Sequence, residues 1–164
     1  MKKVIFTLFA LMISVSTFAQ FERDTYYINT SFSKVGMSFS GQSKFSLAGS
    51  ATAGLFIEDN WAAVAEAGID YGNKHLQEFS AGGGLRYYIQ QNGIYLGLSG
   101  KYLHSNYRNV DGGNYNDVQI KAEVGYAYFL SRTVTIEPAV FYSQSFKDQD
   151  YSQVGFKLGF GFYF

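Results

Sequence analysis

The chain has 164 residues with 13 basic and 13 acidic side chains, and this balance gives no sign of nucleic-acid binding. It contains no cysteine and two histidines, which excludes a disulfide framework and a thiolate metal site and does not favour a zinc site, so no cofactor is expected. Aromatic residues make up 19% of the chain, and 18 glycines stand against one proline, a composition typical of strands and turns.

The first predicted element is a signal peptide over residues 1–19. Lys2 and Lys3 form a basic start, an apolar run follows, and Thr17-Phe18-Ala19 has the small-x-small pattern of a cleavage site. Residues 20–164 are then the mature chain, whose length predicts a single domain. After residue 19 no apolar run reaches the roughly 18 residues of a membrane helix, so a membrane-embedded mature chain has to be a closed barrel.

Segments of alternating apolar and polar or small residues follow, and each is predicted to be a strand. The eight ranges are 25–33, 45–57, 61–71, 78–90, 94–107, 117–130, 133–146 and 153–164. Their connections alternate between short ones, at 58–60, 91–93 and 131–132, and long ones, at 34–44, 72–77, 108–116 and 147–152. This is the pattern of outer-membrane barrels, in which the short turns face the periplasm, and the even number of strands places both termini on that side.

The last predicted strand runs to the end of the chain, from Val154 to Phe164, with large apolar side chains at every second position. Successive side chains of a strand point to opposite faces, so one face of this strand is wholly apolar. This ending resembles the C-terminal assembly signal of bacterial outer-membrane β-barrels, with Phe160, Phe162 and Phe164 as its aromatic residues. The resemblance implies a bacterial outer-membrane location and the barrel-assembly machinery as a partner.

The apolar faces of the predicted strands are expected to meet lipid. A soluble periplasmic ligand-binding barrel is the alternative, and it would turn its apolar face inward. The apolar faces span about the 9–11 residues needed to cross a bilayer, and aromatic residues gather near the short turns as a girdle would. The predicted fold is therefore all-β, an eight-stranded antiparallel up-and-down transmembrane β-barrel. Phe129 and Phe141 depart from the alternation, and Pro138, which cannot donate to the ladder, predicts a bulge.

On this fold four acids and four bases point into the lumen. They are Glu66, Asp70, Arg86, Lys101, Lys121, Glu123, Glu137 and Lys157. An eight-stranded barrel is narrow enough to be filled by its own side chains, and a buried unpaired charge is costly, so these groups are expected to pair. Distances from the short turns predict the pairs Glu66–Arg86 and Lys101–Glu123. A plugged, non-conducting lumen follows, and a narrow pore for small solutes or ions is the alternative.

The two histidines bear on a further alternative, a lipid-modifying enzyme of the outer membrane. The lipid A deacylase family uses a His-x-Ser pair, whereas here His104-Ser105-Asn106 has asparagine at the position of the nucleophile. The lipid A palmitoyltransferase family uses a loop histidine with an adjacent Asp-Ser. His75 lies in a predicted loop, but the chain has no Asp-Ser dipeptide. No catalytic residue is assigned, although another Ser–His–acid arrangement stays open.

The strand pattern and the aromatic C-terminal strand together resemble the small OmpX-like and OmpA-transmembrane-like outer-membrane β-barrel domain family over the whole mature chain. This resemblance implies a non-enzymatic protein with a structural or surface-interaction role through its extracellular loops. It also implies a monomer in contact with outer-membrane lipid and lipopolysaccharide. Expected contact residues for a surface ligand, whose nature the sequence does not reveal, are Tyr107, Tyr115 and Tyr151.

Overall fold

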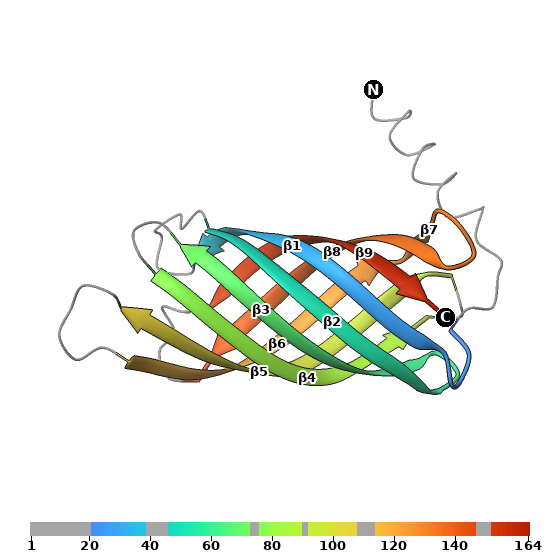
Figure 1. Cartoon of the computed structure of the whole chain (residues 1–164), viewed down its shortest axis with the longest axis horizontal. Helices are drawn as coiled ribbons and strands as arrows, with labels where there is room; N and C mark the ends of the chain where they lie inside the picture. The colour runs from blue at the N-terminus through green and yellow to red at the C-terminus, as the bar shows by residue number, and fades with distance from the viewer. Residues whose placement is uncertain (1–20, 39–45, 73–75, 90–91, 108–113, 147–151) are drawn as a thin grey trace, which may run out of the picture.

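The computed structural model describes residues 21–38, 46–72, 76–89, 92–107, 114–146 and 152–164. The strands are β1 (Tyr26–Ser38), β2 (Ser46–Glu58), β3 (Trp61–Gly72), β4 (Leu76–Tyr88), β5 (Ile94–Tyr107), β6 (Asn114–Tyr126), β7 (Tyr128–Phe129), β8 (Val134–Ser145) and β9 (Gln153–Tyr163). They are tilted relative to a common axis and wrap around it to form a barrel (Figure 1). None of the described residues lies in a helix long and apolar enough to cross a bilayer.

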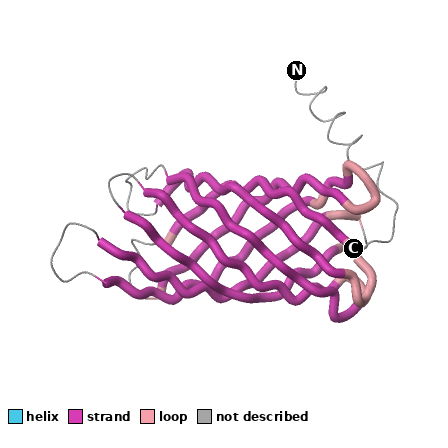
Figure 2. Tube along the Cα trace, viewed as in Figure 1, coloured by secondary structure: helices cyan, strands magenta, loops and turns pink. Residues whose placement is uncertain are grey.

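The strands close into one antiparallel ring. Successive strands pair with each other, apart from β6 and β7, and β1 pairs with β9, so that the sheet closes on itself (Figure 2). β6 and β7 both pair with β8 and are two parts of one strand, so the ring has eight strands and the predicted fold class is confirmed. Observed and predicted ranges differ mainly at strand ends, where backbone pairing carries β1 on to Ser38 and starts β6 at Asn114.

The two ends of the barrel differ. Phe21 and the C-terminal Phe164 lie at the same end as the short connections after β2 and β7 (Figure 1). We call this the short-turn end and the opposite one the far end. Backbone bonds in both directions between Tyr26 and Phe164, at 2.7 and 3.0 Å, close the ring at the short-turn end.

The stagger of the strands can be measured by following paired residues once around the ring. The path passes through Tyr26, Leu55, Ala63, Leu85, Leu98, Ala122, Tyr142, Val154 and Met37. It returns to β1 11 residues further on (37 − 26), one of which is the extra residue of a bulge between Val35 and Met37, so the shear number is 10. Such stagger tilts the strands and brings together side chains that are distant along the chain.

The ladder is interrupted opposite Pro138, where β6 ends and β7 begins. Gly125 pairs with Ala139 on one side of the break and Tyr128 pairs with Ile136 on the other, in the same register. The predicted bulge at Pro138 is therefore wrong. Proline has no N–H to donate, so a hydrogen bond between the strands is lost there without any shift of register.

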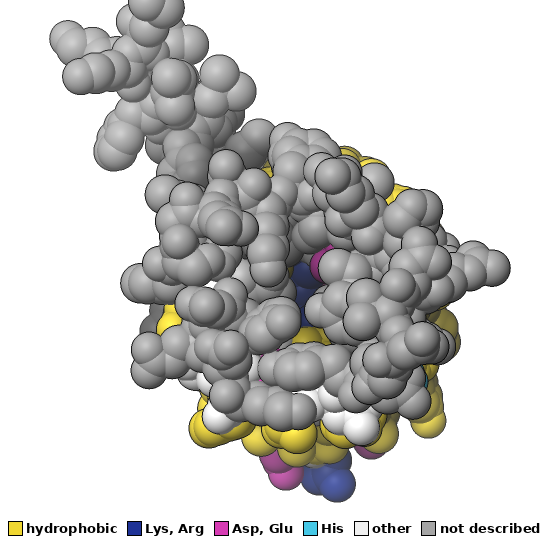
Figure 3. Space-filling model, turned by 90° about the vertical axis from the view of Figure 1, so that its left-hand side faces the viewer, with side chains coloured by type: hydrophobic (Ala, Val, Ile, Leu, Met, Phe, Trp, Pro, Cys, Tyr) yellow, Lys and Arg dark blue, Asp and Glu magenta, His cyan; other side chains and the backbone are white. Residues whose placement is uncertain are grey.

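Side chains alternate between the lumen and the outside along each strand. In β9 the odd-numbered residues from Gly155 to Tyr163 are buried, and the even-numbered ones are exposed. The exposed side chains are large and apolar, and they include Phe32, Leu98, Val124, Phe156, Phe160, Phe162 and Phe164. Figure 3, which looks onto the far end, shows hydrophobic side chains around the outside and charged ones within the opening. A continuous apolar belt of this kind suits lipid rather than water.

Trp61 gives a direct test of which face meets lipid, because it is the single tryptophan of the chain. It points outward at the start of β3, is 43% exposed and packs against Tyr87 at 4.9 Å between ring centroids. In reconstituted vesicles, we expect lipids brominated near the carbonyl end to quench its fluorescence more than lipids brominated near the chain end. Equal emission in brominated and unbrominated vesicles, with quenching only by aqueous acrylamide, would contradict a lipid-facing apolar belt.

Candidate functional site

The lumen is the candidate site, and its described side chains fill it in successive layers. An aromatic cluster occupies the short-turn end, an ion-pair network follows, and hydroxyl and amide groups lie toward the far end. In this last layer, the Ser143 hydroxyl donates to Gln119 at 2.7 Å. The Ser145 hydroxyl and the Gln119 amide both donate to one oxygen of Asp117, at 2.8 and 3.1 Å. These polar groups are buried, and these bonds leave the other oxygen of Asp117, Oδ1, buried without a hydrogen-bond partner among the described residues.

The aromatic cluster consists of Phe21, Phe56, Tyr88, Phe129 and Tyr163. Phe21 stacks on Tyr88 with 4.1 Å between centroids, and Phe129 lies 5.3 Å from Tyr163. The departure of Phe129 from the alternation has its explanation here, because its ring packs inside the barrel. Five aromatic rings at one end of a narrow barrel leave little room for water.

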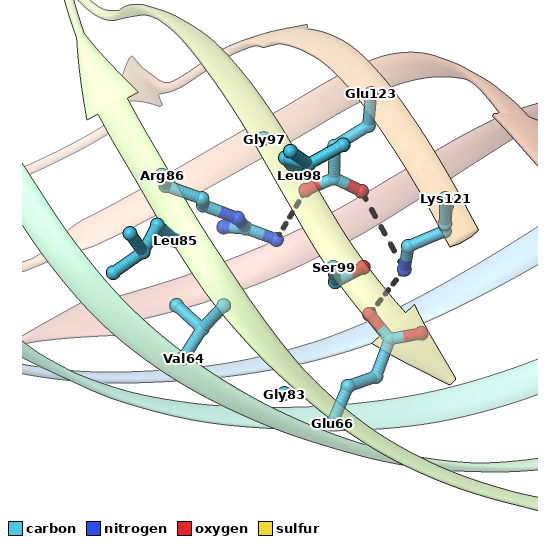
Figure 4. Close-up of a pocket in the computed structure, with 10 residues that line it drawn as sticks. All are labelled: Val64, Glu66, Gly83, Leu85, Arg86, Gly97, Leu98, Ser99, Lys121 and Glu123. Atoms are coloured by element: carbon cyan, nitrogen blue, oxygen red, sulfur yellow. Dashed lines mark hydrogen bonds and ion pairs between the residues drawn. The ribbon is translucent and has the colours of Figure 1, made fainter. Parts of the chain in front are cut away.

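Glu123 is the centre of the ion-pair network (Figure 4). One of its oxygens lies 2.9 Å from Arg86 Nη2, and the other lies 2.6 Å from Lys157 Nζ and 3.7 Å from Lys121 Nζ. Lys121 continues the network to Glu66, at 2.5 Å. Arg86, Lys121, Glu123 and Lys157 are all buried. Charges taken out of water in this way are stable only when partners surround them.

Glu137 forms the other end of the network and is also buried. It accepts hydrogen bonds from the hydroxyls of Tyr27 at 2.6 Å, Thr135 at 2.8 Å and Tyr163 at 3.0 Å. Arg86 Nη1 lies 3.4 Å from it, so one guanidinium bridges the two carboxylates of Glu137 and Glu123. The guanidinium carbon also lies 4.6 Å from the centre of the Tyr95 ring, a cation–π contact.

A glycine makes the Arg86–Glu123 contact possible. Arg86 on β4 pairs with Gly97 on β5, which in turn pairs with Glu123 on β6, so the three residues lie in one row across the barrel wall. A Cβ atom at Gly97 would come within 2.6 Å of Glu123 Cγ. Because Gly97 has no side chain, the arginine and the glutamate meet above the strand that separates them.

Six of the predicted lumen charges are thus brought together: Glu66, Arg86, Lys121, Glu123, Glu137 and Lys157. The partners differ from those predicted, because Glu66 pairs with Lys121 and Glu123 pairs with Arg86 and Lys157. The predicted pairs came from counting residues from the short turns along neighbouring strands. Such a count misses contacts across the lumen between strands that are not adjacent. Asp70 and Lys101 are partly buried and lie further toward the far end of β3 and β5.

The remaining predicted residues lie outside the network. Phe160, Phe162 and Phe164 are exposed on the outward face of the C-terminal strand. Tyr107 is the last residue of β5, and Tyr115 belongs to β6 rather than to the predicted loop, because its backbone pairs with Ser105. Tyr151 and His75 lie outside the described residues.

His104 has no catalytic partner among its described contacts. Its Nδ1 lies 2.7 Å from the side-chain oxygen of Asn116, on the outward side of β5 and β6. In the part of the chain that the structure describes, no cluster of three or more histidine, cysteine or acidic side chains could hold a metal ion.

Comparison with known proteins gives a clear result for the fold. No family model and no curated protein matches the chain. Among solved structures, Neisserial surface protein A aligns with a TM-score of 0.65 at 14% identity, over 85% of this chain and 96% of that one. The N-terminal β-barrel domain of Pseudomonas aeruginosa OprF gives 0.64 at 14% identity, over 87% and 98%. Yersinia pestis Ail in a nanodisc gives 0.57 at 12% identity, over 87% and 100%.

The chain therefore has the fold of the small eight-stranded outer-membrane β-barrels, as the resemblance in the sequence predicted. At these identities the likeness concerns the fold.

Arg86 provides the sharpest test of the network's energetics. Replacing it by methionine removes the one cation that lies within ion-pair distance of Glu137 among the described residues. We expect Arg86→Met to lower the free energy of unfolding by about 3–5 kcal/mol, since a carboxylate is left buried without a counter-charge. Urea titration in vesicles, followed by Trp61 emission, measures this change.

Arg23→Met is the matched control. Arg23 lies 3.8 Å from Glu58, but both side chains are more than 60% exposed, at 63% and 68%. Its loss should cost less than about 1 kcal/mol, because water screens exposed pairs. Equal losses for the two variants would show that the lumen charges are solvated rather than mutually paired.

Proposed function

We propose that this protein is a non-enzymatic, non-conducting barrel of the bacterial outer membrane that acts through its surface connections. The filled lumen is the observation that carries the proposal. Six charged side chains there neutralise one another, with three acids against three bases. Among the described residues, each charged side chain of this network already has a counter-charge within ion-pair distance. The ends and the outward face are then the surfaces available for function.

The packing around the network supports a blocked passage. The cavity beside Arg86, Glu123, Lys121 and Glu66 has a volume of about 10 Å³, the space of roughly one water molecule (Figure 4). The aromatic cluster closes the short-turn end below it. A solute larger than water would have to displace both the cluster and the ion pairs. A narrow pore is therefore the weaker alternative.

We further propose that the short-turn end faces the periplasm and the far end the cell exterior, as in outer-membrane barrels generally. Similar structures are named as surface or attachment proteins, namely Neisserial surface protein A and the attachment invasion locus protein Ail. Ail has also been solved with the heparin analogue sucrose octasulfate, a polyanion, with a TM-score of 0.51 to this chain. These neighbours support a contact role at the outer surface.

The charges of the long connections support an anionic partner. In these connections between the observed strands the basic residues are Lys44, Lys74, Arg108 and Lys147, one in each connection, and the acidic ones are Asp111, Asp148 and Asp150. A basic residue in every connection favours the phosphate groups of lipopolysaccharide as the contact, because basic segments attract anionic lipid headgroups. The short-turn end carries an excess of acidic residues, with Glu22, Asp24, Glu58 and Asp59 against Arg23 and Arg132.

Neither enzyme family considered above gains support from the geometry. His104 faces Asn116 on the lipid side, and an amide can neither act as a nucleophile nor hold an imidazolium as a carboxylate does. The outward apolar belt also argues against a soluble periplasmic ligand-binding barrel, whose apolar residues would line the lumen.

Planar-bilayer recording of the purified protein tests the blocked lumen. We expect no steady conductance from the unmodified chain, because the ion pairs and the aromatic cluster occupy the passage in series. A purified porin serves as the positive control for insertion into the bilayer. A stable, ion-selective current from this protein would overturn the proposal and establish the pore.

Lipopolysaccharide binding tests the surface role separately. Replacing Lys44, Lys74, Arg108 and Lys147 together by glutamine should weaken binding to phosphorylated lipopolysaccharide on vesicles, and added salt should weaken it in the unmodified protein. The control is Arg23→Gln with Arg132→Gln, which removes positive charge at the short-turn end. Equal binding of dephosphorylated lipopolysaccharide, or equal loss in the control, would contradict a phosphate contact at the far end.

A further inference from the structure

Phe21 precedes the first strand, yet its side chain is wholly buried inside the short-turn end of the barrel. Its ring stacks on Tyr88 at 4.1 Å and lies 5.6, 5.7 and 5.8 Å from Phe129, Tyr163 and Phe56. The four surrounding rings come from β2, β4, β7 and β9 and form a cup. Phe21 itself belongs to no strand, and its ring fills this cup at the end of the barrel.

The segment that carries Phe21 is held to the barrel by four hydrogen bonds outside the strand pairs. The Phe21 carbonyl accepts from the Asn60 N–H at 2.7 Å, and the Asp24 N–H donates to the Phe56 carbonyl at 2.9 Å. The Phe56 N–H donates to the Thr25 carbonyl at 2.9 Å, and the Arg23 N–H donates to Asp59 Oδ1 at 3.0 Å. Arg23 contacts Glu58 in an exposed pair, which contributes little. Among these described contacts, burial of the Phe21 ring is the largest stabilising term. None of these contacts belongs to the strand pairs of β1, so release of the segment breaks none of them.

The cup lies directly against the ion-pair network. The hydroxyl of Tyr88 is 3.2 Å from that of Tyr163, which donates to Glu137 at 3.0 Å. When Phe21 is seated, Tyr88 and Tyr163 are shielded from water. When it leaves, water can reach these hydroxyls and, through them, the carboxylate of Glu137.

We propose that residues 21–25 form a strap across the short-turn end and that Phe21 is its removable stopper, which seals the lumen by occupying the aromatic cup. The strap is thus a closure separate from the ion pairs. It controls access to the lumen from one end and is independent of the proposed contact at the far end.

Cysteine labelling tests the stopper, because the chain has no native cysteine. Ala62→Cys places a thiol among the buried residues of the aromatic cluster, and Ser143→Cys places one beyond the network toward the far end. The folded, membrane-reconstituted protein is treated with a water-soluble maleimide, and heat-dependent gel mobility verifies folding. In the Phe21→Ala background we expect the thiol at position 62 to react about tenfold faster or more, because local opening governs access, while position 143 is unchanged.

Phe146→Ala is the matched control, since Phe146 is an exposed phenylalanine directly after β8, and it should leave both rates unchanged. If Phe21→Ala fails to fold, Phe21→Leu is used, and it should raise the rate at position 62 above that of the parent. An unchanged rate at position 62 in the folded Phe21 variant overturns the stopper. So does rapid labelling of the parent. Equal acceleration at positions 62 and 143 also overturns it, because the whole barrel would then have loosened.

Discussion

Side chains that point into a closed eight-stranded barrel meet one another rather than bulk water, and this constraint shapes the whole molecule. Every charge placed there has to find its partner within the lumen. Glu123 does so with Arg86, Lys157 and Lys121, and Glu137 does so with Arg86 and a shell of hydroxyls. The charged members of the network come from β3, β4, β6, β8 and β9, so their ion pairs cross the lumen of the closed ring.

The stagger of the strands and the glycines in the barrel wall allow these lumen charges to reach one another. The shear of 10 places residues of separate strands in shared rows, and Gly97 clears the row in which Arg86 and Glu123 meet. Glycine, usually weak in a strand, is useful here because a large side chain from the next strand covers it. The outward face has the opposite requirement. It meets lipid, so it carries large apolar side chains and needs no pairing.

The alternation along the C-terminal strand, from Val154 to Phe164, was enough to predict the barrel, because a period of two is a local property of the sequence. The six charges of the network lie on the face that this alternation assigns to the lumen, whereas Asp117, also buried there, was not among the predicted charges. The partners of Glu66 and Glu123 did not follow from the alternation, since they depend on the stagger of the whole ring. Phe21 was missed because it precedes the strands and has no period to follow, and only the three-dimensional cup reveals its place.

The central claim is that the lumen charges stabilise one another as a closed set, and a double-mutant cycle on Glu123 and Lys157 tests it most directly. Removing both, as Glu123→Gln with Lys157→Met, leaves Arg86 with Glu137 and Lys121 with Glu66. Unfolding in urea should show each single variant destabilised and the double variant recovering part of the loss, with a coupling energy of about 0.5–3 kcal/mol. Additive losses would mean that water, rather than the partner charge, solvates these groups.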